Sequence, residues 1–257
     1  MLTKKQDFLL MIVWPSLAAF FVLTLNLAGL YAGTLFYILP AVYLSIKIPG
    51  QIKKTLTIAF VWSLLFISLD YIWQSNSAWV INSAFQLKLF GRITFEDFGW
   101  SFICPYFVVI FYEYFFEKDR VSEKTTKTTE TLLKISLVLF SGMILFGLLI
   151  ARPILVPYSY LTVGGALVLI PPIVVLYEFP NLIKKFFGIT VYFAYLSFLL
   201  ELVALNEHYW FFPITSQYIG EISPFGVTFP VEEFLYFIIF SALSILSFYE
   251  FFDDDRM

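Results

Sequence analysis

Six carboxylic acids in apolar surroundings are the side chains of this sequence best suited to do chemistry. Two lie in the middle of apolar stretches, and four form two adjacent pairs where such stretches begin. They are Asp70, Glu201, Glu96, Asp97, Glu232 and Glu233. An ionisable group inside a bilayer costs about 3 kcal/mol or more, so it is by default a functional candidate.

Carboxylic acids among aromatic rings favour one type of reaction. The chain holds 32 Phe, 16 Tyr and 6 Trp residues. A carboxylic acid buried away from water stays protonated, so it can donate its proton to a carbon–carbon double bond. Aromatic faces stabilise the cation that results, and a neighbouring carboxylate removes a proton afterwards. The sequence therefore indicates proton-initiated carbocation chemistry.

A structural role is the alternative for the pair Glu232 and Glu233. Acids in the first turn of a helix interact favourably with its dipole, and a proline such as Pro230 is common there. If the pair is catalytic, its two side chains cannot face one substrate atom equally, because successive helical residues point about 100° apart. We expect Glu232 to be the proton donor, since Tyr236 lies four residues further along the same face.

Motifs for other chemistries are absent from the sequence. There is no glycine-rich dinucleotide or phosphate loop and no Gly-x-Ser-x-Gly nucleophile motif. One Cys and one His do not make up a zinc or iron site, and no stripe of Lys or Arg indicates a nucleic acid partner. We therefore expect no cofactor, no metal and no nucleic acid.

The composition places the acids in a membrane protein. Hydrophobic residues make up 60% of the chain and charged residues 14%, with a mean hydropathy of +0.84. Soluble domains hold about 45–50% apolar and about 25% charged residues. A membrane-spanning helix needs about 20 mostly apolar residues. Eight candidate stretches predict an all-α polytopic fold: 8–28, 32–47, 55–74, 98–116, 132–150, 159–178, 188–206 and 231–251. Seven spans are the alternative, if one of these stretches is re-entrant. We expect Pro171 and Pro172 to kink or break the sixth.

The distribution of positive charge predicts the orientation in the membrane. With eight spans and a cytoplasmic N-terminus, all but three of the 16 Lys and Arg residues fall on the cytoplasmic side. The three exceptions are Lys88, Arg92 and Arg152. The positive-inside rule therefore predicts a multi-pass protein of the cell membrane with both termini in the cytoplasm.

An internal repeat organises the chain. Residues 46–54 (IKIPGQIKK) align with residues 177–185 (YEFPNLIKK) at an offset of 131. The same offset pairs Asp70 with Glu201 and Trp79 with Trp210. Further along the chain, Thr94-Phe95-Glu96-Asp97 aligns with Pro230-Val231-Glu232-Glu233 at an offset of 136. Tyr112-Glu113 aligns with Tyr249-Glu250 at an offset of 137. We expect a first four-helix repeat at 1–116, a charged cytoplasmic linker at 117–131 and a second repeat at 132–257. Four spans in each copy predict a parallel duplication about an axis along the membrane normal.

Depth in the membrane predicts one shared site. Asp70 lies 16 residues beyond Lys54, which is about 24 Å along a helix, and Glu201 lies equally far beyond Lys185. Both therefore reach the outer part of the bilayer, where the two acidic pairs begin their helices. We expect the six acids to converge in a pocket that opens to lipid. Trp79 and Trp210 fit an aromatic belt at the membrane surface, and their match across the repeat also makes them candidates for that pocket.

The segment Pro230-Val231-Glu232-Glu233-Phe234-Leu235-Tyr236-Phe237 resembles the Pro-x-Glu-(Glu/Asp) motif of the membrane lycopene cyclases. Glu201, Trp210 and the loop that follows are also similar to that family, and the tandem layout resembles its fused form over nearly the whole chain. In the first copy Thr94 stands where the motif has proline.

The resemblance implies a lycopene β-cyclase that forms β-ionone rings without net redox change. It implies that Glu232 and Glu233 are needed for activity, with Glu201, Asp70, Glu96 and Asp97 as further candidates. We expect the substrate to contact Trp210, Trp79, Tyr236, Pro230 and Phe234. The soluble-type cyclases use flavin, but this chain lacks a dinucleotide motif, so we expect no tightly bound flavin. A related polyisoprenoid enzyme such as a hydratase, and a non-catalytic carotenoid or lipid carrier, remain alternatives.

Overall fold

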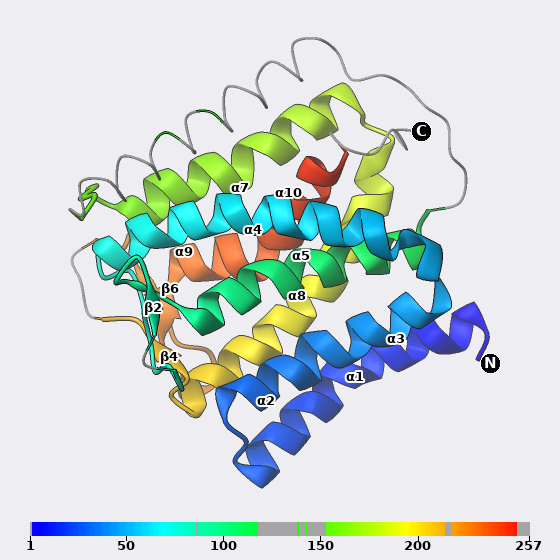
Figure 1. Ribbon diagram of the computed structural model, residues 1–257, viewed down its shortest axis with the longest axis horizontal. Coiled ribbons are helices and arrows are strands. Elements are labelled where there is room, and N and C mark those ends of the chain that lie inside the picture. The colour runs from blue at the N-terminus through cyan, green and yellow to red at the C-terminus, as the bar shows by residue number, and fades with distance from the viewer. Residues whose placement is uncertain are drawn as a thin grey trace.

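Apolar runs of this length fold as helices because a bilayer offers the backbone no hydrogen-bond partner, so each peptide group must bond within its own helix. The computed structural model describes residues 2–85, 87–117, 138, 142, 153–213 and 217–250 (Figure 1). Within these residues, seven helical stretches are long and apolar enough to cross a membrane. The chain is therefore an all-α membrane protein. Apart from residues 117, 138 and 142, the expected linker 117–131 and the expected span 132–150 lie outside the described residues.

Four of the seven stretches precede the linker. In chain order their elements are α1 (Lys4–Leu25), α2 (Gly29–Gly33), the π-helical segment η1 (Thr34–Ile38), α3 (Leu39–Lys47), the 3-10 turn η2 (Pro49–Gln51), α4 (Ile52–Ser75) and α5 (Phe95–Phe115). The start of α1 is fixed by a capping box, in which Thr3 and Gln6 each bond the other's backbone N–H. The expected spans agree with these helices to within a few residues at most ends.

Three stretches follow the linker. Their elements are α7 (Ser159–Glu178), α8 (Leu182–Asn206), α9 (Val231–Glu233), the π-helical segment η4 (Phe234–Phe240) and α10 (Ser241–Tyr249). The last three run on as one stretch, Val231–Tyr249. Of the expected kink or break at Pro171 and Pro172, the break is wrong, because α7 runs through both prolines as a single helix.

Short antiparallel strands gather at one end of the helix bundle (Figure 1). β1 (Val80–Ile81) pairs with β4 (Trp210–Phe211), β2 (Lys88–Leu89) with β3 (Ile93–Thr94), and β5 (Glu221–Ile222) with β6 (Phe229–Pro230). A 3-10 turn, η3 (Pro224–Gly226), lies within the last hairpin. β3 leads directly into α5, and β6 leads directly into α9. Two hairpins therefore fix where the helices that carry the acidic pairs begin.

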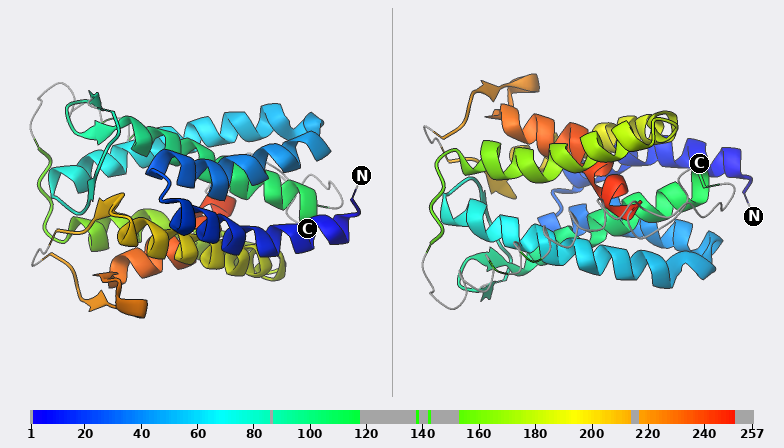
Figure 2. Two further views of the ribbon diagram at one scale, coloured as in Figure 1. Left: turned by 90° about the horizontal axis from the view of Figure 1, so that it is seen from below. Right: turned by 90° about the horizontal axis from the view of Figure 1, so that it is seen from above.

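Aromatic side chains fill the core between the helices. Phe107 and Phe111 of α5 are fully buried, and the ring of Phe111 stacks on Tyr192 of α8 with 4.4 Å between centroids. The outward side of α1 exposes large apolar side chains such as Leu9 and Phe20, which suits contact with lipid tails. Figure 2 shows α1 and α3 along one side of the bundle.

The two halves share local backbone geometry at the offsets found in the sequence. Beyond α4, the N–H of Ala78 donates to the carbonyl of Trp73 at 2.9 Å, and beyond α8 the N–H of Tyr209 donates to the carbonyl of Ala204 at 2.8 Å. In both turns the residue before the N–H donor has a positive φ, which is 55° at Ser77 and 57° at His208. The corresponding residues of the two bonds lie 131 positions apart.

Candidate functional site

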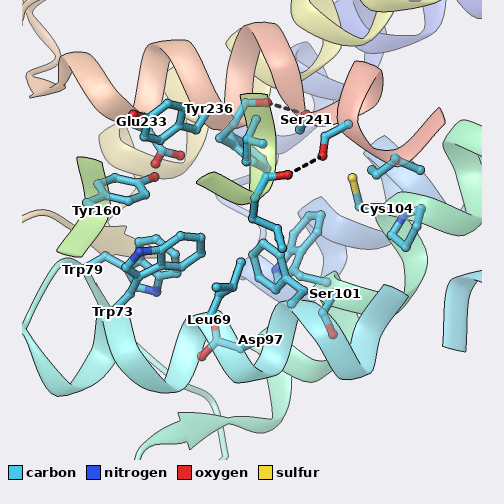
Figure 3. Close-up of a pocket in the computed structure, with 18 of the residues that line it drawn as sticks. Leu69, Trp73, Trp79, Asp97, Ser101, Cys104, Tyr160, Glu233, Tyr236 and Ser241 are labelled. Atoms are coloured by element: carbon cyan, nitrogen blue, oxygen red, sulfur yellow. Dashed lines mark hydrogen bonds between the residues drawn. The ribbon is translucent and has the colours of Figure 1, made fainter. Parts of the chain in front are cut away.

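A cavity of about 140 Å³ lies among α4, α5, α7, α8 and the last helical stretch. Its wall is mainly aromatic and includes five of the six tryptophans of the chain, Trp62, Trp73, Trp79, Trp100 and Trp210. Among the lining residues that the structure describes, the charged ones are Asp97 and Glu233. Figure 3 shows these two acids on opposite sides of the cavity. The cavity therefore combines two carboxyl groups with many π faces.

Glu233 is the more available of the two acids. It lies in the first helical turn after Pro230 and is only 6% exposed. Its carboxylate makes no hydrogen bond with any residue that the structure describes. In Figure 3 the carboxylate is turned toward the hydroxyl of Tyr160. A buried carboxylate without a partner is expensive, so the neutral, protonated acid is the cheaper form at this position.

Asp97 is held in a helix cap. Its Oδ2 accepts hydrogen bonds from the Thr94 hydroxyl at 2.8 Å and the Thr94 N–H at 3.1 Å. The Asp97 N–H donates back to the Thr94 hydroxyl oxygen at 3.2 Å, which completes a capping box at the start of α5. Gln74 adds a bond to the same oxygen at 3.4 Å. Hydrogen bonds donated to a carboxylate favour its ionised form.

The mid-helix acids lie immediately behind the cavity wall. Glu201 of α8 is fully buried, and its Oε1 accepts a hydrogen bond at 3.1 Å from the indole nitrogen of Trp210. Asp70 of α4 is also fully buried, and Gln74 and Asp97 are its polar neighbours. Each mid-helix acid therefore lies beside a residue that lines the cavity. The acid itself is not among the lining residues.

Glu96 and Glu232 are hydrogen-bonded to the loops that precede their helices. Glu96 accepts hydrogen bonds from the N–H of Ala84 at 2.6 Å and the hydroxyl of Ser83 at 2.8 Å. Glu232 accepts one from the N–H of Ile219 at 2.7 Å. These bonds attach the loops to the helix starts. Glu233 lines the cavity whereas Glu232 is not among its lining residues, so the geometry favours Glu233 over Glu232, the residue expected to donate the proton.

Glycines in α2 and α7 make room for two aromatic lining residues. A Cβ atom on Gly164 would lie 2.9 Å from the ring of Tyr236, and a Cβ atom on Gly33 would lie 3.1 Å from the ring of Trp100. Both distances are shorter than an ordinary carbon–carbon contact of about 3.5–4.0 Å. Each ring therefore lies directly against a helix backbone. The bond from the Tyr236 hydroxyl to the Leu161 carbonyl, 3.0 Å, holds that ring in place.

Sequence reasoning found part of the aromatic wall. Trp79, Trp210 and Tyr236 line the cavity as expected, whereas Pro230 and Phe234 are not among its lining residues. Trp79 and Trp210 therefore belong to the cavity wall, and their place in an aromatic belt at the membrane surface stays a prediction. Trp73, Trp100 and Tyr160 also line the cavity but were not expected from the sequence. Trp100 was detectable, because the offset of 136 matches it with Tyr236.

The cavity wall draws corresponding residues from both halves of the chain. At an offset of 131 or 136, six residues of the first half match six of the second. The pairs are Leu69 and Leu200, Trp79 and Trp210, Ile81 and Phe212, Asp97 and Glu233, Trp100 and Tyr236, and Ser101 and Phe237. The strand pair β1–β4 beside the cavity joins Val80 to Phe211, which are also 131 residues apart. The cavity wall therefore contains residues that match one another at the offsets found in the sequence.

Within the part of the chain that the structure describes, no three His, Cys, Asp or Glu side chains come together as a possible metal site. Comparison of the chain with protein-family models, with curated proteins and with solved structures gave no match.

Proposed function

We propose that this protein is a membrane lycopene β-cyclase that works by acid–base carbocation chemistry. The observation that carries the proposal is the Glu233 carboxyl group, which is buried, has no hydrogen bond in the described structure and lies in a cavity wall that holds five tryptophans. A protonated acid and a set of π faces are what a polyene needs in order to form and hold a cation.

The proposed reaction adds one proton and removes one. Glu233 donates its proton to C2 of an acyclic ψ end group, which leaves a cation at C1. The electrons of the C5=C6 double bond then form the C1–C6 bond and transfer the charge to C5. Loss of the proton from C6 restores the C5=C6 double bond in a β-ionone ring. We assign this last step to Asp97, the other carboxylate of the cavity wall. Because the protons balance, the reaction needs no oxidant or reductant.

The size and lining of the cavity fit one end group. A water-sized group occupies roughly 10–15 Å³ of such a volume, so about 140 Å³ holds about ten heavy atoms. A trimethylcyclohexenyl ring is of that size. The rings of Trp73, Trp79 and Tyr160 form a cluster with centroids 5.1–5.4 Å apart, so several π faces are available to one cation. The rest of the polyene extends from the cavity toward the lipid, from which so apolar a substrate arrives.

We also propose that the chain is a parallel duplication of a four-helix unit, with eight spans and both termini in the cytoplasm. The far end of the bundle supports the duplication. The Tyr112 hydroxyl donates to Glu250 at 3.3 Å, and the Tyr249 hydroxyl donates to Glu113. These bonds are reciprocal, since Tyr112 matches Tyr249 and Glu113 matches Glu250 at an offset of 137. A twofold axis between the halves produces this arrangement.

The test is expression of the chain in a bacterial host that makes lycopene, with chromatography of the pigments. The proposal predicts yellow-orange cyclic carotenoids. Hydroxylated acyclic products would instead identify a hydratase, and unchanged lycopene at full membrane expression would identify a carrier.

Two adjacent variants refine this test. Glu233→Gln removes the acid, and we expect it to lower cyclisation by about 10²–10⁴-fold. Glu232→Gln keeps an oxygen that accepts the bond from Ile219, so we expect near-normal cyclisation. Normal yield from Glu233→Gln at matched protein levels would contradict the acid role.

A further inference from the structure

The two acids of the cavity wall follow different residues at the same backbone position. Thr94 precedes α5 and Pro230 precedes α9, and each lies three residues before its acid. The backbone angles are nearly equal, with φ −74° and ψ 160° at Thr94 and φ −61° and ψ 147° at Pro230. The two helix starts therefore differ in chemistry more than in shape.

Thr94 binds its acid through two donors that proline lacks. Its hydroxyl and its backbone N–H both donate to Asp97 Oδ2, at 2.8 and 3.1 Å. Proline has neither a hydroxyl nor a backbone N–H. Consequently no residue caps α9 with a side-chain bond, and Glu233 keeps its carboxyl group free in the cavity wall.

We propose that Pro230 is a positioning residue that keeps Glu233 out of a capping box, and so keeps its carboxyl group available to donate a proton. This inference rests on the proposed function and extends it. In the first copy the cap holds Asp97 as an ionised acceptor, whereas in the second copy proline leaves Glu233 as the donor. The difference between threonine and proline at this position thus gives the cavity one capped acid and one free acid, as proton transfer across it requires.

Restoring threonine at position 230 is the direct perturbation. Pro230→Thr would create Thr-Val-Glu-Glu, which is the Ser/Thr-x-x-Glu pattern of a capping box with Glu233 as the bonded acid. The backbone at Pro230 already has angles like those of Thr94, so threonine fits without strain. Pro230→Val is the matched control, because valine has nearly the shape of threonine and restores the N–H but not the hydroxyl.

The experiment measures turnover, KM, the pH–rate profile and the unfolding temperature of the wild type and both variants in membranes or detergent. We expect the turnover of Pro230→Thr to be about 10-fold or more below that of Pro230→Val. The KM of the two variants should be equal, because the aromatic wall is intact in both. The alkaline limb of the Pro230→Thr profile should move to lower pH, since the new bonds favour the ionised carboxylate, which cannot donate. The unfolding temperature of Pro230→Thr should equal or exceed that of Pro230→Val, because a cap stabilises the helix.

A loss of activity without loss of stability separates this role from a purely structural one. If Pro230→Thr and Pro230→Val both match the wild type in turnover and pH profile while Glu233→Gln is inactive, the inference about Pro230 is overturned and the proposed function stands. If Glu233→Gln is itself fully active, the proposed acid role fails as well.

Discussion

Replacing Gly164 with alanine should push an aromatic ring into the cavity. The added Cβ atom would lie 2.9 and 3.0 Å from two ring carbons of Tyr236 and 3.3 Å from Trp73. An ordinary contact needs about 3.5 Å, so the Tyr236 ring must move by about 0.6 Å. The backbone of α7 lies behind the ring, so the ring moves toward the cavity and strains its hydroxyl bond to Leu161, now 3.0 Å long.

The expected effect on stability is small and the effect on activity is large. Overpacking costs about 1–3 kcal/mol, and replacing glycine by alanine in a helix returns about 1 kcal/mol. The free energy of unfolding of Gly164→Ala should therefore fall by about 0–2 kcal/mol. Turnover should fall by about 10–100-fold, because a displacement approaching 1 Å can cost about 10²-fold in rate.

Gly99→Ala is the matched control for this variant. Gly99 lies inside α5 next to the lining residue Trp100, but a Cβ atom there meets nothing within 4 Å. This control should gain up to about 1 kcal/mol of stability and keep its activity. The assay pairs thermal unfolding in detergent with cyclisation of lycopene at matched protein levels. Full activity of Gly164→Ala, or an equal loss in both variants, would refute the reasoning.

Three further predictions concern the bundle. Tyr249→Phe removes a hydrogen bond to the buried carboxylate of Glu113 and should lower the free energy of unfolding by about 1.5–3 kcal/mol without changing the product; a changed product pattern would contradict this structural role. Trp210→Phe leaves Glu201 without its indole donor, so thermal unfolding should show a loss of about 1–3 kcal/mol together with reduced turnover. Reporter tags at the N-terminus and within 117–131 should both be cytoplasmic, and an external tag at either place would contradict the proposed topology.

The positions of the membrane helices were predictable because the hydropathy of the sequence is sufficient to locate them. A run of about 20 apolar residues has no other stable form in a bilayer, and even Pro171 and Pro172 do not interrupt α7. The positions of the acids along their helices were predictable for the same reason, since each residue adds a fixed rise. Of the six acids expected to share one pocket, Asp97 and Glu233 are among the described residues that line the cavity, and the other four are not.

The direction of each side chain was not predictable from helical spacing. Glu232 and Glu233 both fit the pattern, and the choice between them comes from a loop bond to Ile219, which joins residues 13 positions apart. Similarly, the contact of Gly164 with Tyr236 joins two helices that are distant in the sequence. Such contacts are set by tertiary packing, which leaves no local signal.

In the proposed duplication, the change of offset from 136 to 137 coincides with a feature of the helix backbone. Glu96 matches Glu232 at 136 and Tyr112 matches Tyr249 at 137, so the last span holds one extra residue between those points. The π-helical segment η4, Phe234–Phe240, lies between them. A π-bulge accommodates one extra residue in a helix and is frequent at functional sites. In the proposed duplication, this π-helical segment would keep the cavity acids and the reciprocal Tyr–Glu bonds at matching positions in the two copies.

Proton-initiated cyclisation is tested most directly by isotope incorporation from solvent. Membranes that contain the protein would convert lycopene in deuterated buffer, and mass spectrometry with NMR would locate the label in the product. The acid mechanism predicts one deuteron at C2 of each new β-ionone ring, because the proton on Glu233 exchanges with solvent between turnovers. Rings formed in deuterated buffer without any deuterium at C2 would contradict proton donation by a protein carboxyl group.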